Sequence, residues 1–160
     1  MSFQSVRSWL ADHAPDVRII DAHDSTATVA DAAATLGVEP ARIAKTLTVR
    51  AGDLTFLLCT RGDARLSNQK CKAALGARPR MLGAEETLAL SGHEVGGVCP
   101  FGVATPLPVY VDVSLKPYPT VFPAAGSRNS SVELTPQRLF DLVGEKWVDL
   151  CTLPEESAGP

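Results

Sequence analysis

Residues 45–59 read KTLTVRAGDLTFLLC and predict a β-hairpin. The flanking stretches, 45–50 and 54–59, are rich in β-branched and large apolar residues, which favour extended structure. Between them, Ala51-Gly52-Asp53 supplies the Gly and Asp that tight reversals favour. We therefore expect two antiparallel strands joined by a short turn.

Lys45 stands out within this hairpin. Side chains alternate between the two faces of a strand, so Lys45 shares a face with Leu47 and Val49. An unpaired ammonium is costly to bury, so Lys45 either extends to solvent at the strand end or serves a pocket. The strand by itself favours the first interpretation.

Helical and extended segments follow one another along the rest of the chain and predict an α+β fold. A first helix is expected from Ser2 or Ser5 to about His13, and further helices at 29–36, 67–75, 84–90 and 136–143, with a helical turn from Pro40. Further strands are expected at 17–20, 80–82, 109–113, 120–122, 131–134 and 147–150. They predict a single domain over 1–153, with one mixed, curled and barrel-like sheet and helices packed outside it. Residues 154–160 are expected to be a flexible tail.

Composition excludes several classes of protein. A chain of 160 residues with 45% apolar and 21% charged residues is ordinary for one globular domain with its own core. The sequence contains no apolar run long enough to cross a bilayer and no signal peptide, so we expect a cytoplasmic protein with no membrane partner. The net charge of −3 argues against a non-specific nucleic-acid binder, and DNA is not an expected partner.

Four cysteines and three histidines are scattered along the chain. No cysteine pair has C-x-x-C spacing, and no histidine stands at a zinc-ligand spacing from a cysteine. The pair His93-Glu94 does not extend to H-E-x-x-H. We therefore expect no metal and no cofactor.

A glycine-rich segment, Gly96-Gly97-Val98-Cys99-Pro100-Phe101-Gly102, is the second unusual feature. Glycine lets a backbone approach a ligand closely, and proline stiffens the loop. The segment suits either a rigid loop whose N–H groups face an oxyanion or a tight turn between strands. It matches neither a P-loop nor a dinucleotide fingerprint.

Basic residues gather between positions 61 and 80, where Asp63 is the one acidic residue. A patch of this kind either contacts phosphates or is a solvated helix face. The basic residues are Arg61, Arg65, Lys70, Lys72, Arg78 and Arg80.

Four short motifs, taken together and in order, resemble the YbaK/prolyl-tRNA-synthetase-associated editing domain family. They are Ile43-Ala44-Lys45-Thr46-Leu47, Gly97-Val98-Cys99-Pro100-Phe101-Gly102, Val109-Tyr110-Val111-Asp112 and Ala124-Ala125-Gly126-Ser127. The similarity extends from about Ser25 to Trp147, and it is greatest to free-standing proteins of the YbaK/EbsC type. Such proteins remove amino acids wrongly attached to tRNA, most often tRNA for proline.

The resemblance implies site residues. Lys45 matches the family's lysine and would be the catalytic residue, either stabilising negative charge or acting as a base toward water. The implied substrate-binding residues are Gly97, Val98, Cys99, Phe101, Gly102, Asp112, Gly126, Ser127 and Asn129. Phosphates of the tRNA would contact Arg61, Arg65, Lys70 and Lys72. Catalysis by the Cys99 thiol is disfavoured, because no helix N-terminus follows to lower its pKa.

Two functions from different classes are compatible with these features. The first is an aminoacyl-tRNA deacylase that acts on mischarged tRNA carrying Cys, Ala, Ser or Thr, with tRNA for proline expected and a prolyl-tRNA synthetase as a possible partner. The second is a non-catalytic module of the same fold that binds tRNA, a synthetase or a small ligand. The joint presence of Lys45 and the glycine-rich segment favours the enzyme.

Overall fold

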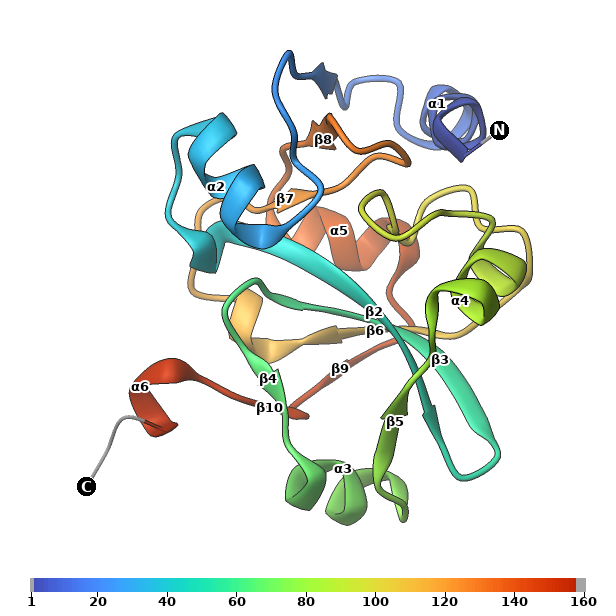
Figure 1. Cartoon of the computed structure of the whole chain (residues 1–160), viewed down its shortest axis with the longest axis vertical. Helices are drawn as coiled ribbons and strands as arrows, with labels where there is room; N and C mark the ends of the chain where they lie inside the picture. The colour runs from blue at the N-terminus through green and yellow to red at the C-terminus, as the bar shows by residue number, and fades with distance from the viewer. Residues whose placement is uncertain (1, 158–160) are drawn as a thin grey trace.

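The computed structural model describes residues 2–157, and its centre is a six-stranded mixed sheet with helices around it (Figure 1). Five strands follow the order β5-β2-β3-β6-β9, and β7 pairs with the outer edge of β2 near its start. Their bounds are β2 Ile43–Ala51, β3 Leu54–Arg61, β5 Pro79–Met81, β6 Val109–Asp112, β7 Phe122–Pro123 and β9 Lys146–Val148. The α+β class is confirmed.

The predicted hairpin is confirmed as β2 and β3, the longest strands of the sheet. Their antiparallel register places Lys45 opposite Thr60 and Leu47 opposite Leu58. On its other side β3 pairs in parallel with β6, which pairs in parallel with β9. The hairpin is therefore the middle of the sheet, and its side chains contact layers on both faces.

Two further pairs of short strands flank this sheet, and the sheets do not close into a barrel. β1 (Ile19–Asp21) pairs with β8 (Ser130–Val132), and β4 (Arg65–Leu66) pairs with β10 (Cys151–Thr152). The sequence did not predict β4 or β10, because two-residue strands contain too few residues to show alternation.

The helices begin and end close to the predicted positions, since capping residues are local signals. The N-terminal caps are formed as predicted, by the side chains of Thr28, Ser67 and Thr135, each of which accepts a hydrogen bond from a backbone N–H of the first turn. At the C-terminal ends, two helices end at glycines in the left-handed conformation, Gly37 and Gly76. The helices are α1 Ser2–His13, α2 Val29–Leu36, α3 Asn68–Leu75, α4 Ala84–Ser91, α5 Pro136–Val143 and α6 Pro154–Ser157, with 3₁₀ turns η1 Pro40–Arg42 and η2 Val113–Leu115. No helix within residues 2–157 is long and apolar enough to span a bilayer.

Apolar side chains of β3 alternate between two separate hydrophobic clusters. Leu57 and Cys59 belong to the larger cluster, which includes residues of α1 and α5. Phe56 and Leu58 belong to a second cluster, beside α3 and β10. Both clusters are buried, so the sheet is covered on two faces and its strands lack the alternation of exposed and buried residues.

The end of the chain is partly ordered. Helix α6 begins at Pro154, and Glu155 pairs with Arg61 at 2.9 Å. This contact connects the start of the expected tail to β3, while residues 158–160 lie outside the described residues.

Candidate functional site

An opening in the pairing of β2 creates the site. β7 pairs with Ile43 and Ala44, and β5 pairs with residues 49–51 on the same side of the strand. Between these two neighbours, residues 45–48 have no partner strand on that side. One backbone group in this stretch does have a partner, because the Thr48 carbonyl accepts a hydrogen bond from the Leu82 N–H at 3.0 Å.

Strand geometry determines which backbone groups face this opening. Along an antiparallel strand, N–H and C=O groups of successive residues point alternately to one side and the other. Because Thr48 directs its carbonyl to the opening, Thr46 directs its own N–H and C=O there as well. Lys45 and Leu47 direct theirs to β3. The Thr46 N–H is therefore a strand donor without a strand partner.

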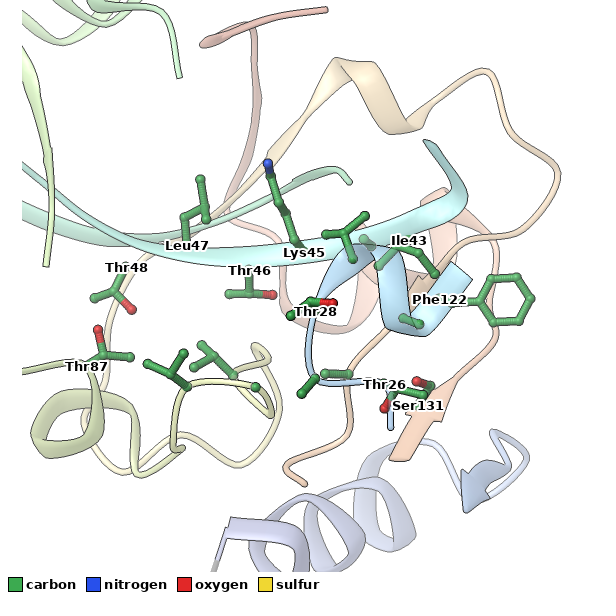
Figure 2. A pocket seen from close by; sticks show the side chains of 18 of the residues that line it. Thr26, Thr28, Ile43, Lys45, Thr46, Leu47, Thr48, Thr87, Phe122 and Ser131 are labelled. Carbon is green, nitrogen blue, oxygen red and sulfur yellow. The ribbon is translucent and has the colours of Figure 1, made fainter. Parts of the chain in front are cut away.

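A cavity of about 260 Å³ lies at this opening, lined mainly by threonines and apolar side chains (Figure 2). Its walls come from β2, from residues 26–32 around the start of α2, from Thr87 of α4, from the glycine-rich segment and from β7 and β8. Lys45 is the one titratable residue in the lining. The cavity is thus small, rich in hydroxyl groups and free of acidic side chains.

Two of these hydroxyls are unusual. Thr26 and Thr48 are each 5% exposed, and their Oγ1 atoms have no hydrogen-bond partner within residues 2–157. By contrast, Thr46 Oγ1 lies 3.6 Å from Cys59 Sγ, and Thr87 Oγ1 donates to the Leu82 carbonyl at 3.5 Å. Buried hydroxyls are normally paired, so Thr26 and Thr48 are candidates for contact with a ligand.

The Lys45 ammonium does not enter the cavity. Figure 2 shows its side chain on the face of β2 shared with Leu47, whereas Thr46 and Thr48 point to the other face. Lys45 Nζ donates to the Ala64 carbonyl at 2.5 Å. Burial lowers the pKa of this ammonium, although the nearby Cys151 and Asp63 oppose the shift. The half-buried side chain is therefore neither fully extended to solvent nor inside the pocket.

The glycine-rich segment contributes to the cavity through its first residues. Gly96 and Val98 line it, while Gly97 packs against the backbone of Gly126 and Ser127. A Cβ on Gly97 would lie 2.7 Å from Gly126 C and Ser127 N, which explains the glycine at this position. The glycine-rich segment and the turn at residues 126–127 are therefore in direct contact.

The later residues of the segment lie in the core rather than in the cavity lining. Cys99 and Phe101 are fully buried, and Phe101 packs on Trp9 of α1. Gly102 has φ +58 and contacts the backbone of Ser5 and Val6. Phe101 and Gly102 therefore position the segment against α1.

The Cys99 thiol is poorly suited to nucleophilic attack. Burial raises its pKa to about 12, so the thiol stays protonated at neutral pH. Its Sγ lies 3.7 Å from His93 Nε2, which is 2.8 Å from the Phe101 carbonyl. A carbonyl can only accept, so Nε2 carries the ring proton and cannot take one from the thiol.

The other residues implied by the resemblance lie outside the cavity lining. Asn129 donates its amide to the Ala22 carbonyl at 3.0 Å, and Ser127 Oγ donates to Asn129 Oδ1 at 3.0 Å. Asp112 is buried, and its carboxylate accepts the N–H groups of Ser114 and Leu150. These contacts give all three side chains partners within the fold.

The four expected tRNA-binding residues divide into two pairs. Arg61 is 8% exposed and forms ion pairs with Asp63 and Glu155. The Lys70 ammonium donates hydrogen bonds to Asp149 and to the Cys151 carbonyl. Arg65 and Lys72 are exposed. Of the four, Arg65 and Lys72 are therefore the two that are exposed and have no carboxylate partner among residues 2–157.

Residues 2–157 contain no group of three or more His, Cys, Asp or Glu side chains placed to hold a metal ion. The threonines of the cavity were not predicted as site residues. A signal was present, because Thr46 and Thr48 put two polar side chains on one face of a strand in the middle of the sheet.

The chain matches the aminoacyl-tRNA editing domain over residues 23–142, which include every wall of the cavity. It therefore belongs to this family, of the YbaK/EbsC type, as its motifs indicated.

Relatives include free-standing proteins and parts of synthetases. The chain is 46% identical to the uncharacterized protein YwhH of Bacillus subtilis strain 168, over 94% of this chain and 98% of that protein. It is 29% identical to EbsC of Enterococcus faecalis, a candidate Cys-tRNA(Pro)/Cys-tRNA(Cys) deacylase, over 81% of this chain and 79% of EbsC. A proline–tRNA ligase of Bacillus pumilus is 29% identical, over 83% of this chain but 24% of the ligase.

Among solved structures, a candidate trans-editing enzyme for prolyl-tRNA synthetase superposes with a TM-score of 0.86 at 32% identity. The superposition covers 94% of this chain and 97% of that one. The fold of the free-standing editing proteins is therefore present over almost the whole chain.

Proposed function

We propose that the protein is a trans-editing deacylase that hydrolyses the ester between a small, wrongly attached amino acid and the 3′-terminal ribose of tRNA, with tRNA for proline as the expected substrate. The observation that carries the proposal is the small, hydroxyl-rich cavity at the open edge of β2, where the Thr46 N–H has no strand partner. A volume of about 260 Å³ suits a small acyl group.

The reaction needs little from the protein, because an aminoacyl ester is already activated. Water attacks the ester carbon, the carbon–oxygen bond to the ribose breaks, and a proton from water passes to the ribose oxygen. Negative charge develops on the carbonyl oxygen during attack, and a fixed N–H such as that of Thr46 stabilises it. Exclusion of bulk water by the apolar walls strengthens this interaction.

Lys45 remains the proposed catalytic side chain, but its ammonium must move to the other side of β2 to act. Its ammonium must leave the Ala64 carbonyl before it reaches an ester held in the cavity. The open edge of β2 at residues 45–48 gives a long, flexible side chain a path around the strand. Once there, the ammonium would bind the carbonyl or ribose oxygens and stabilise the developing charge.

A non-catalytic module that binds mischarged tRNA is the second candidate. It is favoured by the absence of carboxylate, histidine and cysteine side chains from the cavity lining, because a conventional hydrolase would place a base or nucleophile there.

Turnover of tRNA(Pro) charged separately with Ala, Cys, Ser and Thr separates the two candidates. The deacylase should release at least one amino acid faster than spontaneous hydrolysis, with and without EDTA. Binding without release would support the module instead, and loss of activity in EDTA that zinc restores would contradict the metal-free mechanism.

A further inference from the structure

Thr26 and Thr48 lie at different parts of one cavity. Figure 2 shows Thr48 beside Thr87 at one end and Thr26 beside Ser131 at the other, with Thr46 between them. All five residues line the cavity, and the hydroxyls of Thr26 and Thr48 are the two buried side-chain oxygens of residues 2–157 without a partner. Two unpaired hydroxyls at different parts of one cavity suit a ligand that has a hydrogen-bonding group at each of its own ends.

An amino acid joined to a ribose is a ligand of this kind, and this step rests on the proposed deacylase function. Successive strand residues rise about 3.3 Å, so Thr46 and Thr48 are about 6.6 Å apart along one face of β2. A small amino acid whose carbonyl oxygen accepts from the Thr46 N–H can therefore extend its side chain toward Thr48. The ribose then lies toward Thr26.

We propose that the cavity selects a hydroxyl-bearing amino acid, seryl or threonyl, with Thr48 pairing the side-chain hydroxyl and Thr26 pairing a hydroxyl of the terminal ribose. Leu82 and Thr87, both buried, close the Thr48 end around the acyl side chain. Seryl and threonyl groups pair the Thr48 hydroxyl, whereas alanyl and valyl groups leave it unpaired in a dry site. An unpaired buried hydroxyl lowers the relative rate by roughly tenfold to a hundredfold.

The substitution Thr48→Val tests this proposal, because valine keeps the shape of threonine and removes the hydroxyl. We compare release of Ser and Ala from the same tRNA under single-turnover conditions. The wild type should prefer Ser by roughly tenfold or more, and Thr48→Val should remove that preference. Thr26→Val should retain the preference but become insensitive to replacement of the terminal ribose by its 2′-deoxy form.

Thermal unfolding distinguishes ligand recognition from a structural role. Thr48→Val and Thr26→Val should leave Tm unchanged or raise it, since neither hydroxyl bonds to the folded protein. Thr55→Val is a matched control, because Thr55 lies on β3 outside the cavity lining and accepts from Arg50 Nε. It should leave the Ser-to-Ala ratio unchanged.

The measured rates and Tm values distinguish an error in the inferred selectivity from an error in the proposed deacylase function. A wild type that releases Ala faster than Ser, or a Thr48→Val variant that keeps the wild-type ratio, overturns the inference but leaves the deacylase function intact. A lowered Tm in Thr48→Val also overturns it, by showing that the hydroxyl is bonded within the fold. Absence of release from every charged tRNA contradicts the proposed function itself.

Discussion

The Lys45 ammonium donates a 2.5 Å hydrogen bond to the Ala64 carbonyl, on the face of β2 opposite the Thr46 and Thr48 side chains. This bond gives the buried charge an acceptor, which an ammonium among apolar neighbours requires. It also holds Lys45 away from the acyl cavity. Catalysis by Lys45 therefore requires a side-chain movement, whereas recognition by the threonines does not.

The substitution Lys45→Ala should lower deacylation by about 10²–10³-fold, the usual loss when one transition-state stabiliser is removed. Lys45→Met is the matched control for packing, since it keeps most of the apolar stem without the charge. We expect both variants to lose activity to a similar extent, measured as release of the amino acid in single-turnover assays. A wild-type rate in Lys45→Ala would show that the strand edge supports the reaction without the ammonium.

The Gly97→Ala substitution should displace the glycine-rich segment, because its Cβ would lie 2.7 Å from Gly126 C and Ser127 N. Backbone atoms cannot move aside as flexible side chains do, so we expect a loss of roughly 1–3 kcal/mol in the free energy of unfolding, with reduced activity. Gly83→Ala is the control, since a Cβ there meets nothing within 4 Å. Urea denaturation measures both variants, and equal stabilities would contradict the close packing.

Arg65 and Lys72 should provide the phosphate contacts of the basic region, because both are exposed while Arg61 and Lys70 are paired with carboxylates. The double variant Arg65→Ala, Lys72→Ala should weaken tRNA binding and reduce the salt dependence of log K by about 1 per lost contact. Hydrolysis of a small aminoacyl ester, which has no acceptor stem, should be unchanged.

A control for this variant removes two charges elsewhere. Arg7 belongs to α1 and Arg18 directly precedes β1, and both are exposed. Helix α1 lies at the opposite end of the molecule from α3 (Figure 1). Alanine at both positions should leave the salt slope as in the wild type. If the two double variants have equal slopes, the region around Arg65 is a solvated surface and not a tRNA contact.

Stability should fall at alkaline pH because of the buried thiols. Burial raises the pKa of Cys59 and of Cys99 to about 12, from 9.0. A raised pKa means that the folded state keeps the proton, so this stabilisation is complete below pH 9 and is lost as pH rises toward 12. At pH 10 each thiol should contribute roughly 1 kcal/mol less than at pH 8.

The lowered pKa of Lys45 acts in the opposite direction, since the unfolded chain binds its proton more tightly and stability rises with pH below about 10.5. The pKa values of the Cys71 and Cys151 thiols are raised by burial as well, so the four thiols together should outweigh one half-buried amine. Denaturation of the wild type and of Cys99→Ala at pH 8 and pH 10 measures the effect. A Cys99→Ala variant with undiminished pH dependence would contradict the assignment to this thiol.

The sequence by itself determined the elements whose signals are local. The β2–β3 hairpin follows from its alternating apolar residues and Gly52-Asp53 turn, and α2 and α5 begin at the predicted Thr28 and Thr135 caps. The four ordered motifs also identified the family, because they preserve residue type and spacing along the chain. The hairpin and capping signals lie within a few residues of the elements that they specify, whereas the family signal is the order of the four motifs along the chain.

The tertiary structure decided where the cavity lies and which residues line it. The gap along β2 exists because β7 and β5, about 40 residues apart in sequence, pair with different parts of the same strand edge. Because side chains alternate along β2, Lys45 points toward Ala64, whereas Thr46 and Thr48 point into the cavity. The family motifs had suggested instead that Lys45 faces the ligand. Which face of a strand meets a ligand depends on what packs against each face, and that packing comes from segments distant in the chain.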